Sequence, residues 1–137
     1  MSKDWVADLE EMHVKFGVRE AVAKLDDVKL QAFLAFRLSF LEEELEETRE
    51  AGTAAEIVDG LVDLCVVAIG TLQAFGVDAH EAWHRVHEAN MSKEAGHNSK
   101  RPNQFGLPDL VKPAGWTAPI HDDNVGLLAR TMKGVSR

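Results

Sequence analysis

Residues 29–50 read KLQAFLAFRLSFLEEELEETRE, and this stretch decides the fold class. Its apolar side chains recur at intervals of three and four residues, which is the spacing of one face of an α-helix. Asp26 or Asp27 can cap the start of such a helix, and Gly52 lies just beyond its end. The stretch therefore predicts a long helix with one apolar face.

Patterns of the same kind on both sides predict further helices. They are expected over residues 4–16, 19–25, 54–75, 79–94 and 124–133. All four prolines lie between positions 102 and 119, so residues 97–123 are expected to be extended. There is little strand signal, and the pattern as a whole predicts an all-α fold.

The length of 137 residues allows one domain but not two independent cores. We expect a single all-α domain over residues 1–137, an antiparallel bundle of four main helices with its core at about 29–95 and an extended tail at 97–123. The helix over 54–75 is apolar on nearly every side, which predicts that it forms the buried centre of the bundle. Two long helices this apolar also call for cover from another subunit, so we expect a homodimer or homotetramer.

The composition excludes several kinds of partner. The chain carries 15 Lys and Arg against 23 Asp and Glu, a formal net charge of −8, which argues against nucleic acid. No stretch approaches the roughly 18 consecutive apolar residues of a membrane helix. The charged first residues show no targeting signal, and the single cysteine, Cys65, excludes an intramolecular disulfide. We therefore expect a cytoplasmic protein with no membrane partner.

Six glutamates lie between positions 42 and 50 of the long helix, and they divide into two sets. On a helical wheel, Glu44 and Glu47 fall within the apolar arc and Glu43 lies at its edge. Glu42 and Glu46 point the other way, as expected of a solvated helix face. Ionised carboxylates on a buried arc are costly unless a cation or hydrogen-bond donors compensate them. The inward set is therefore a candidate binding site.

A second acidic stripe lies in the helix expected over 54–75. Glu56, Asp59 and Asp63 share one side of it and are its only acids. On consecutive antiparallel helices the two stripes can face each other and form an all-oxygen site, which favours Mg²⁺, or Mn²⁺ as a substitute, over zinc. A buried network between the glutamates and Arg37, which lies on the same arc as Glu44, is the alternative.

Basic and amide side chains follow in the next predicted helix and beyond it. Asn90 and Lys93 share one stripe of that helix, and Lys100 and Arg101 lie in the extended segment. These four are candidate phosphate ligands, although Asn and Lys near a helix end are as often plain surface residues.

His80, His84 and His87 follow another stripe of the helix expected over 79–94, with a spacing that can bind zinc. No HExxH arrangement accompanies them, and such histidines are more typical of a helix surface. A zinc site is the less favoured interpretation.

Three stretches together resemble a known family. FLEEELEET at 40–48, EIVDGLVDLCVVAIG at 56–70 and NMSK at 90–93 resemble the MazG-like and phosphoribosyl-ATP pyrophosphohydrolase-like all-α nucleoside triphosphate pyrophosphohydrolases. DLVKPAGWTAP at 109–119 looks like the small forms found in bacteriophages. The resemblance covers about residues 30–120. It implies an enzyme of a bacterial cell or phage-infected host.

The resemblance implies Mg²⁺-dependent hydrolysis of a (deoxy)nucleoside triphosphate to a monophosphate and pyrophosphate. The family pattern EExxE falls on Glu43, Glu44 and Glu47, because the wheel turns the register one residue earlier outward. Glu44 and Glu47 are then expected to bind the metal and Glu43 to act as the general base.

The second half of the family pattern, ExxD, departs from the common form. Read literally it is Glu56 to Asp59, whereas the apolar context points to Asp59 with Asp63, four residues apart. We favour Asp59 and Asp63 as metal ligands, and Glu56 stays an alternative ligand.

Two other functions stay open from the sequence. Phosphoribosyl-ATP pyrophosphohydrolase activity in histidine biosynthesis would use the same carboxylates on the same phosphates. A non-catalytic helical module, whose buried acids serve specific oligomerisation, belongs to a different class and would not bind Mg²⁺.

Overall fold

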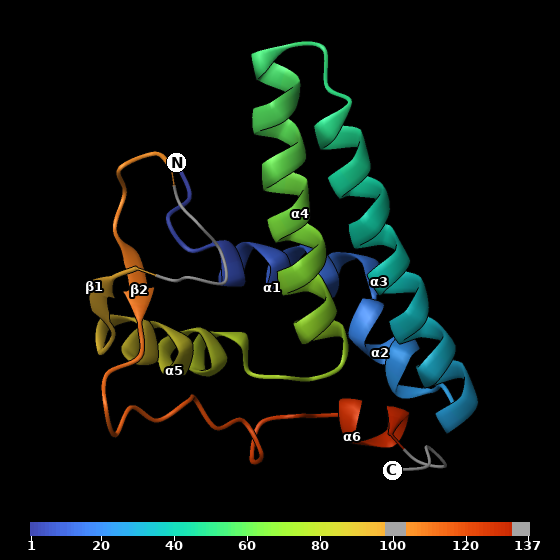
Figure 1. Cartoon of the computed structure of the whole chain (residues 1–137). Coiled ribbons are helices and arrows are strands. Elements are labelled where there is room, and N and C mark those ends of the chain that lie inside the picture. Colours follow the sequence, from blue (N-terminus) through green and yellow to red (C-terminus); the bar gives the residue numbers. More distant parts are fainter. Residues whose placement is uncertain (98–103, 133–137) are drawn as a thin grey trace. The chain divides into compact units, whose positions relative to one another are not determined.

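The computed structural model describes residues 1–97 and 104–132 (Figure 1). Within these ranges the chain forms six helices and two three-residue strands. The helices are α1 Trp5–Phe16, α2 Val18–Ala23, α3 Asp27–Arg49, α4 Ala54–Ala74, α5 Ala79–Met91 and α6 Leu128–Thr131. The strands, β1 Glu94–Gly96 and β2 Asp109–Val111, pair antiparallel. The expected all-α class is confirmed.

The chain divides into two compact units. One comprises residues 1–79 and 123–137, and the other residues 80–122. The first holds α1 to α4 and α6, and the second holds nearly all of α5 and the strand pair. Among the described residues, no single helix has both the length and the apolar character needed to cross a membrane.

Side-chain caps define where the helices begin. The carboxylate of Asp26 accepts a hydrogen bond of 2.8 Å from Lys29 N at the start of α3, so the first of the two candidate caps is the one used. Thr53 caps α4, and Gly17 ends α1 as its position predicts. The helix expected over 79–94 ends earlier, at Met91, because residues 94–96 pair with β2 instead.

The core of the first unit lies where α2, the start of α3 and the end of α4 meet. Its buried residues are Val22, Leu30, Ala74 and Phe75, and Leu127 and Leu128 next to and within α6 pack against them. The ring of Phe33 lies 5.5 Å from that of Phe75 between centroids. Arg130 of α6 pairs with Asp27 of α3 at 2.6 Å, which fixes the C-terminal helix to this core.

The two chain passages between the units lie side by side. Asp78 N donates to Asn124 Oδ1, and Asn124 Nδ2 donates to Asp78 O, both over 2.9 Å. Leu127 N also donates to Phe75 O over 2.7 Å. These bonds join residues that are far apart in sequence on either side of residues 80–122.

Helices α3 and α4 form an antiparallel pair that runs beyond the core (Figure 1). Their contacts keep one register: Phe33 meets Phe75, Arg37 meets Thr71, and Thr48 meets Gly60. Each step along α3 is matched by an equal step back along α4. This register sets which side chains face each other further along the pair.

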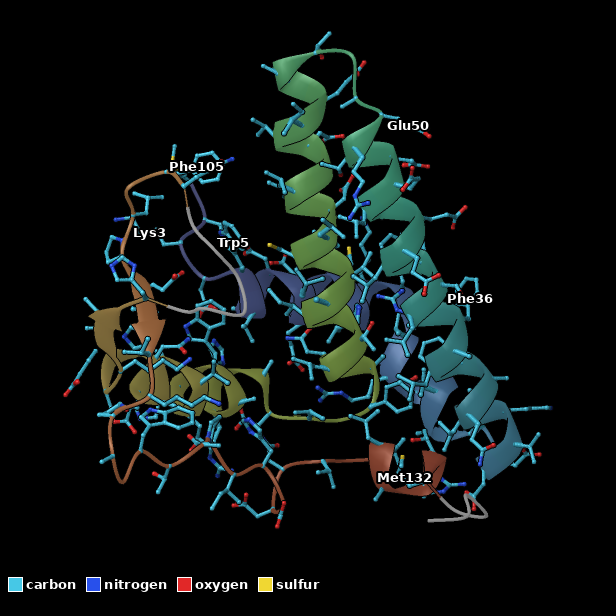
Figure 2. All side chains as sticks on the ribbon, viewed as in Figure 1. Lys3, Trp5, Phe36, Glu50, Phe105 and Met132 are labelled. Atoms are coloured by element: carbon cyan, nitrogen blue, oxygen red, sulfur yellow. The ribbon has the colours of Figure 1, made fainter. Side chains whose placement is uncertain are left out.

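The expectation that α4 forms the buried centre is wrong for its first half in the single chain. Ile57, Val58, Leu61 and Val62 are 43 to 64% exposed, whereas the buried residues of α4 are Val67, Gly70, Gln73 and Ala74. Phe36 of α3 also projects into solvent (Figure 2). The reason is geometric: the buried core lies at the C-terminal end of α4, where Ala74 and Phe75 belong to it, and the exposed residues lie toward the other end.

The second unit is organised around Trp116. The indole Nε1 donates to Ala89 O of α5 over 2.9 Å, and Arg85 Nη1 donates to Ile120 O over 2.9 Å. Both bonds tie the segment after β2 to α5. The segment expected to be extended therefore lies along a helix.

Candidate active site

The acidic stripes of α3 and α4 do face each other. The pKa of Glu44 is raised, first by its partial removal from water and then by repulsion from four neighbouring carboxylates. These belong to Glu47, Asp63, Glu43 and Asp59. Two of these four neighbours lie on α4, so the effect crosses between the helices. Glu44 therefore lies within electrostatic range of four other carboxylates.

These carboxylates are more open to solvent than the helical wheel predicts. Glu44 and Asp63 are half-buried, but Glu43, Glu47 and Asp59 are exposed. The expected buried position of Glu47 is wrong for the single chain, because the apolar arc that flanks it is itself partly exposed, as at Leu45. The acids thus lie on the partly exposed faces of two neighbouring helices and not in a closed core.

A close approach of the two helices lies beside the acids. A Cβ at Gly60 would overlap the hydroxyl of Thr48, so only glycine lets α3 and α4 come this near. Thr48 Oγ1 also donates to Glu44 O over 2.7 Å, which turns its hydroxyl along its own helix. The pair of small side chains holds the two acidic stripes within reach of each other.

Glu56 serves the turn between the helices. Its carboxylate accepts a hydrogen bond of 2.7 Å from Gly52 N, while its own N–H donates to Thr53 Oγ1 over 3.2 Å. This is a variant of the capping box, in which the glutamate reaches back to the start of its helix. Glu56 is also absent from the charges that act on Glu44.

Arg37 does not neutralise the glutamates. Its Nε donates to Thr71 Oγ1 over 2.9 Å and its Nη2 to Val67 O over 3.1 Å. It lies two helical turns from Glu44 along α3, or about 10 Å at 1.5 Å per residue. The structure therefore gives no support to the alternative of a buried Arg–Glu network.

The candidate phosphate ligands lie elsewhere in the chain. Asn90 is exposed and Lys93 half-buried, and both belong to the second unit. The Lys93 ammonium lies 5.3 Å from the centre of the Trp116 ring, which Lys112 also approaches, at 5.1 Å. Lys100 and Arg101 lie outside the described residues. A role for any of these four in binding phosphate stays a prediction.

Within residues 1–97 and 104–132, no three His, Cys, Asp or Glu side chains stand close enough together to hold one metal ion. His84 instead lies 3.4 Å from Glu88 on its own helix. For the acids of α3 and α4, like charges repel, and side chains of this length can rotate toward a cation. A donor set made only of carboxylates, one of them with a raised pKa, fits a hard divalent ion.

The structure is thus an all-α fold that carries acidic side chains on two neighbouring antiparallel helices. Residues 18–90, just over half of the 137-residue chain, match the family model of phosphoribosyl-ATP pyrophosphohydrolase. The chain belongs to this family, as the resemblance of its motifs predicts. No curated protein and no solved structure matches it. Family membership supports nucleotide pyrophosphohydrolase activity in the broad sense, and the likeness to phage-type forms stays a prediction.

Proposed function

We propose that the chain hydrolyses (deoxy)nucleoside triphosphates to a monophosphate and pyrophosphate with Mg²⁺. The observation that carries this proposal is the cluster of carboxylates from α3 and α4 around Glu44, within the region that matches the family. Water adds to phosphorus, and the bond between the α-phosphorus and the bridging oxygen breaks, so that pyrophosphate leaves.

Glu44, Glu47, Asp59 and Asp63 are the residues that would hold the ion. When bound, Mg²⁺ offsets the charge of the phosphate oxygens and favours attack by water. Glu56 is the weaker candidate, because its carboxylate already bonds to Gly52 N in the turn. This bond supports our preference for Asp59 with Asp63 over Glu56 with Asp59.

Glu43 is our candidate for the general base. It lies next to Glu44 at the exposed edge of the stripe, and it is one of the charges that raise the pKa of Glu44. Because Glu43 is not one of the proposed metal ligands, its carboxylate is free to accept the proton of the attacking water. No covalent intermediate on the protein is needed.

Hydrolysis of phosphoribosyl-ATP is the second candidate, because the matched family carries that name. The same carboxylates would act on the same phosphates, and pyrophosphate would again be released. The two candidates differ in what lies beyond the phosphates, so a substrate comparison separates them.

A homo-oligomer accompanies this proposal. Apolar side chains at Ile57, Val58, Leu61 and Val62 are largely exposed on the first half of α4, beside the acidic stripe. Exposed apolar patches of this kind mark protein contact surfaces. A second copy that covered them would also reduce the exposure of the acids.

The experiment is an assay of the purified chain with Mg²⁺ against ribo- and deoxynucleoside triphosphates and phosphoribosyl-ATP, with pyrophosphate measured by ion chromatography. Release from triphosphates that stops when a chelator removes the metal is the expected result. Release only from phosphoribosyl-ATP supports the second candidate. If no nucleotide yields pyrophosphate, both enzymatic proposals are wrong.

A further inference from the structure

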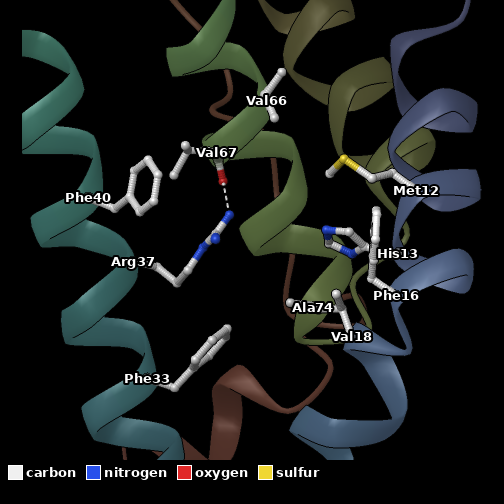
Figure 3. A pocket seen from close by; sticks show the side chains of 10 residues that line it. All are labelled: Met12, His13, Phe16, Val18, Phe33, Arg37, Phe40, Val66, Val67 and Ala74. Atoms are coloured by element: carbon white, nitrogen blue, oxygen red, sulfur yellow. Dashed lines mark hydrogen bonds between the residues drawn. The ribbon is translucent and has the colours of Figure 1, made fainter.

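A cavity of about 260 Å³ lies between α1, α3 and α4 of the first unit (Figure 3). It is lined by Met12, His13, Phe16, Val18, Phe33, Arg37, Phe40, Val66, Val67 and Ala74. The volume lies slightly below the roughly 300 Å³ at which pockets for drug-sized molecules begin. Apolar and aromatic walls with two polar groups, Arg37 and His13, are the usual composition of a small-molecule site.

Arg37 brings a cation and unused donors to this cavity. Its bonds to Thr71 and Val67 occupy two of the five N–H groups of a guanidinium, and both acceptors are uncharged. The side chain is half-buried, and burial lowers its pKa. A partly desolvated cation that bonds only to neutral oxygens attracts an acceptor from a ligand.

His13 brings an unsatisfied polar atom. The residue is 8% exposed, and its Nδ1 is buried without a hydrogen-bond partner among the described residues. Burial and the nearby charge of Arg37 lower the pKa of His13, so that the neutral ring is favoured. A neutral imidazole can both donate and accept, and a buried nitrogen without a partner is costly.

Gly70 leaves room between these two groups. A Cβ there would lie 3.2 Å from Arg37 Nη2 and 3.2 Å from His13 Nε2, which approach α4 from α3 and α1 (Figure 3). Any larger residue would crowd both side chains. The absence of a side chain at Gly70 therefore leaves the space that Arg37 and His13 occupy.

The cavity and the acids lie on one stripe of α3. Phe33, Arg37, Phe40, Glu44 and Glu47 follow each other at steps of four and three residues, so they share a face. Glu44 lies seven residues after Arg37, which is about 10 Å along the helix axis. A base and a ribose bridge a comparable distance in a nucleotide whose α-phosphate lies at the acids.

We propose that this cavity binds the base of the nucleotide and that Arg37 selects bases with a carbonyl oxygen on the ring. The inference rests on the proposed function, which it extends to the class of substrate. Arg37 offers only donors, and guanine, uracil, thymine and cytosine each present a carbonyl oxygen to accept from it. Adenine has no carbonyl oxygen, and its ring acceptor N7 lies beside an exocyclic amino donor that opposes a second N–H of the guanidinium. The aromatic walls supply ring contacts.

Binding of nucleosides without phosphates tests the cavity apart from catalysis. The probes are guanosine, uridine, cytidine and adenosine, and the readout is the ring nitrogen signals of His13 in NMR spectra, assigned with His13→Gln. The first three are expected to shift these signals at lower concentrations than adenosine does. Arg37→Gln should abolish the shifts, while Lys29→Gln, an exposed cation on the same helix, should retain them.

Gly70→Ala provides a second variant in case Arg37→Gln does not fold, since it narrows the space between His13 and Arg37 while both side chains stay present. It should weaken every nucleoside shift. No shift with any nucleoside in the wild type, an equal shift with adenosine, or shifts unchanged in the variants would overturn the proposal.

Kinetics separate a failure of this inference from a failure of the proposed function. Arg37→Gln should raise KM about tenfold or more for a preferred triphosphate, as expected for the loss of a hydrogen bond from a charged group. For inorganic tripolyphosphate, which has no base, KM should be the same in the wild type and in Arg37→Gln. Pyrophosphate release with an unchanged KM in Arg37→Gln refutes the base pocket but leaves the hydrolase intact. Nucleoside binding without any pyrophosphate release does the reverse.

Discussion

Thr48 of α3 lies directly over Gly60 of α4, so close that any Cβ at position 60 would overlap its hydroxyl. This contact falls in the same register as the hydrogen bond from Arg37 to Thr71. Thr48 and Gly60 lie beside the acidic stripes, and the half-buried guanidinium of Arg37 joins the same two helices further along. The separation of the two acidic stripes is fixed between them.

Gly60→Ala is expected to destabilise the protein by about 1–2 kcal/mol, because overpacking costs about 1–3 kcal/mol and alanine recovers up to about 1 kcal/mol of helix propensity. Thr48→Ala together with Gly60→Ala should restore the stability, since it removes the overlapping atoms. Urea unfolding of both single variants and the double variant measures this as a coupling energy. Additive effects in that cycle would argue against the contact.

Glu47→Gln should lower the rate of pyrophosphate release on the order of 100-fold, because it removes a proposed metal ligand. The matched control is Glu46→Gln, the same change one residue away on the outward face. Mg²⁺ should raise the melting temperature of the wild type and of the control but not of Glu47→Gln. Equal losses of activity in both variants would contradict the assigned register.

Glu44 should make the metal-free protein less stable as pH rises. Its pKa in the fold is raised above 4.5, so the folded state binds its proton more tightly than the unfolded chain does. The associated stability is present below that pH and is lost as pH rises through the raised value. Glu44→Gln should therefore gain on the wild type between acidic and neutral pH in a chelator, as followed by thermal unfolding. If the difference in stability between Glu44→Gln and the wild type does not change with pH, or if Glu42→Gln shows the same difference, repulsion at Glu44 is not its cause.

Val58→Asp is expected to shift the chain from oligomer to monomer. The side chain is 64% exposed in the single chain, so an aspartate there is well solvated and the fold should be retained. Sedimentation velocity measures the change, and Ala21→Asp on the exposed face of α2 is the control. A wild type that sediments as a monomer at all concentrations would refute the oligomer.

The helical part of the fold could be predicted from local patterns. The boundaries of α1, α3 and α4 follow from caps and apolar spacing within a few residues. The strand pair could not, because three residues are too short to show an alternating pattern. The exposure of α4 was also beyond the sequence, since an apolar face predicts that something covers it but not which element does.

The acidic site shows the same division. The wheel separates Glu44 and Glu47 from Glu42 and Glu46, because a helical face depends only on spacing. It could not assign Glu56 to the turn, since that needs the backbone N–H of Gly52, outside the helix. Nor does any spacing mark His13, which reaches Gly70 and Arg37 only once three helices have packed.

The reciprocal bonds between Asp78 and Asn124 have a consequence for how this chain can diversify. They join the points at which the polypeptide leaves and re-enters the acid-bearing unit. Residues 80–122 therefore form an inserted segment whose two ends are hydrogen-bonded to each other's flanks. Such an inserted segment can grow, shrink or be exchanged without opening the hydrogen bonds at its base. The acidic residues of α3 and α4 can then stay the same while the inserted segment changes at its own rate, as surface loops do.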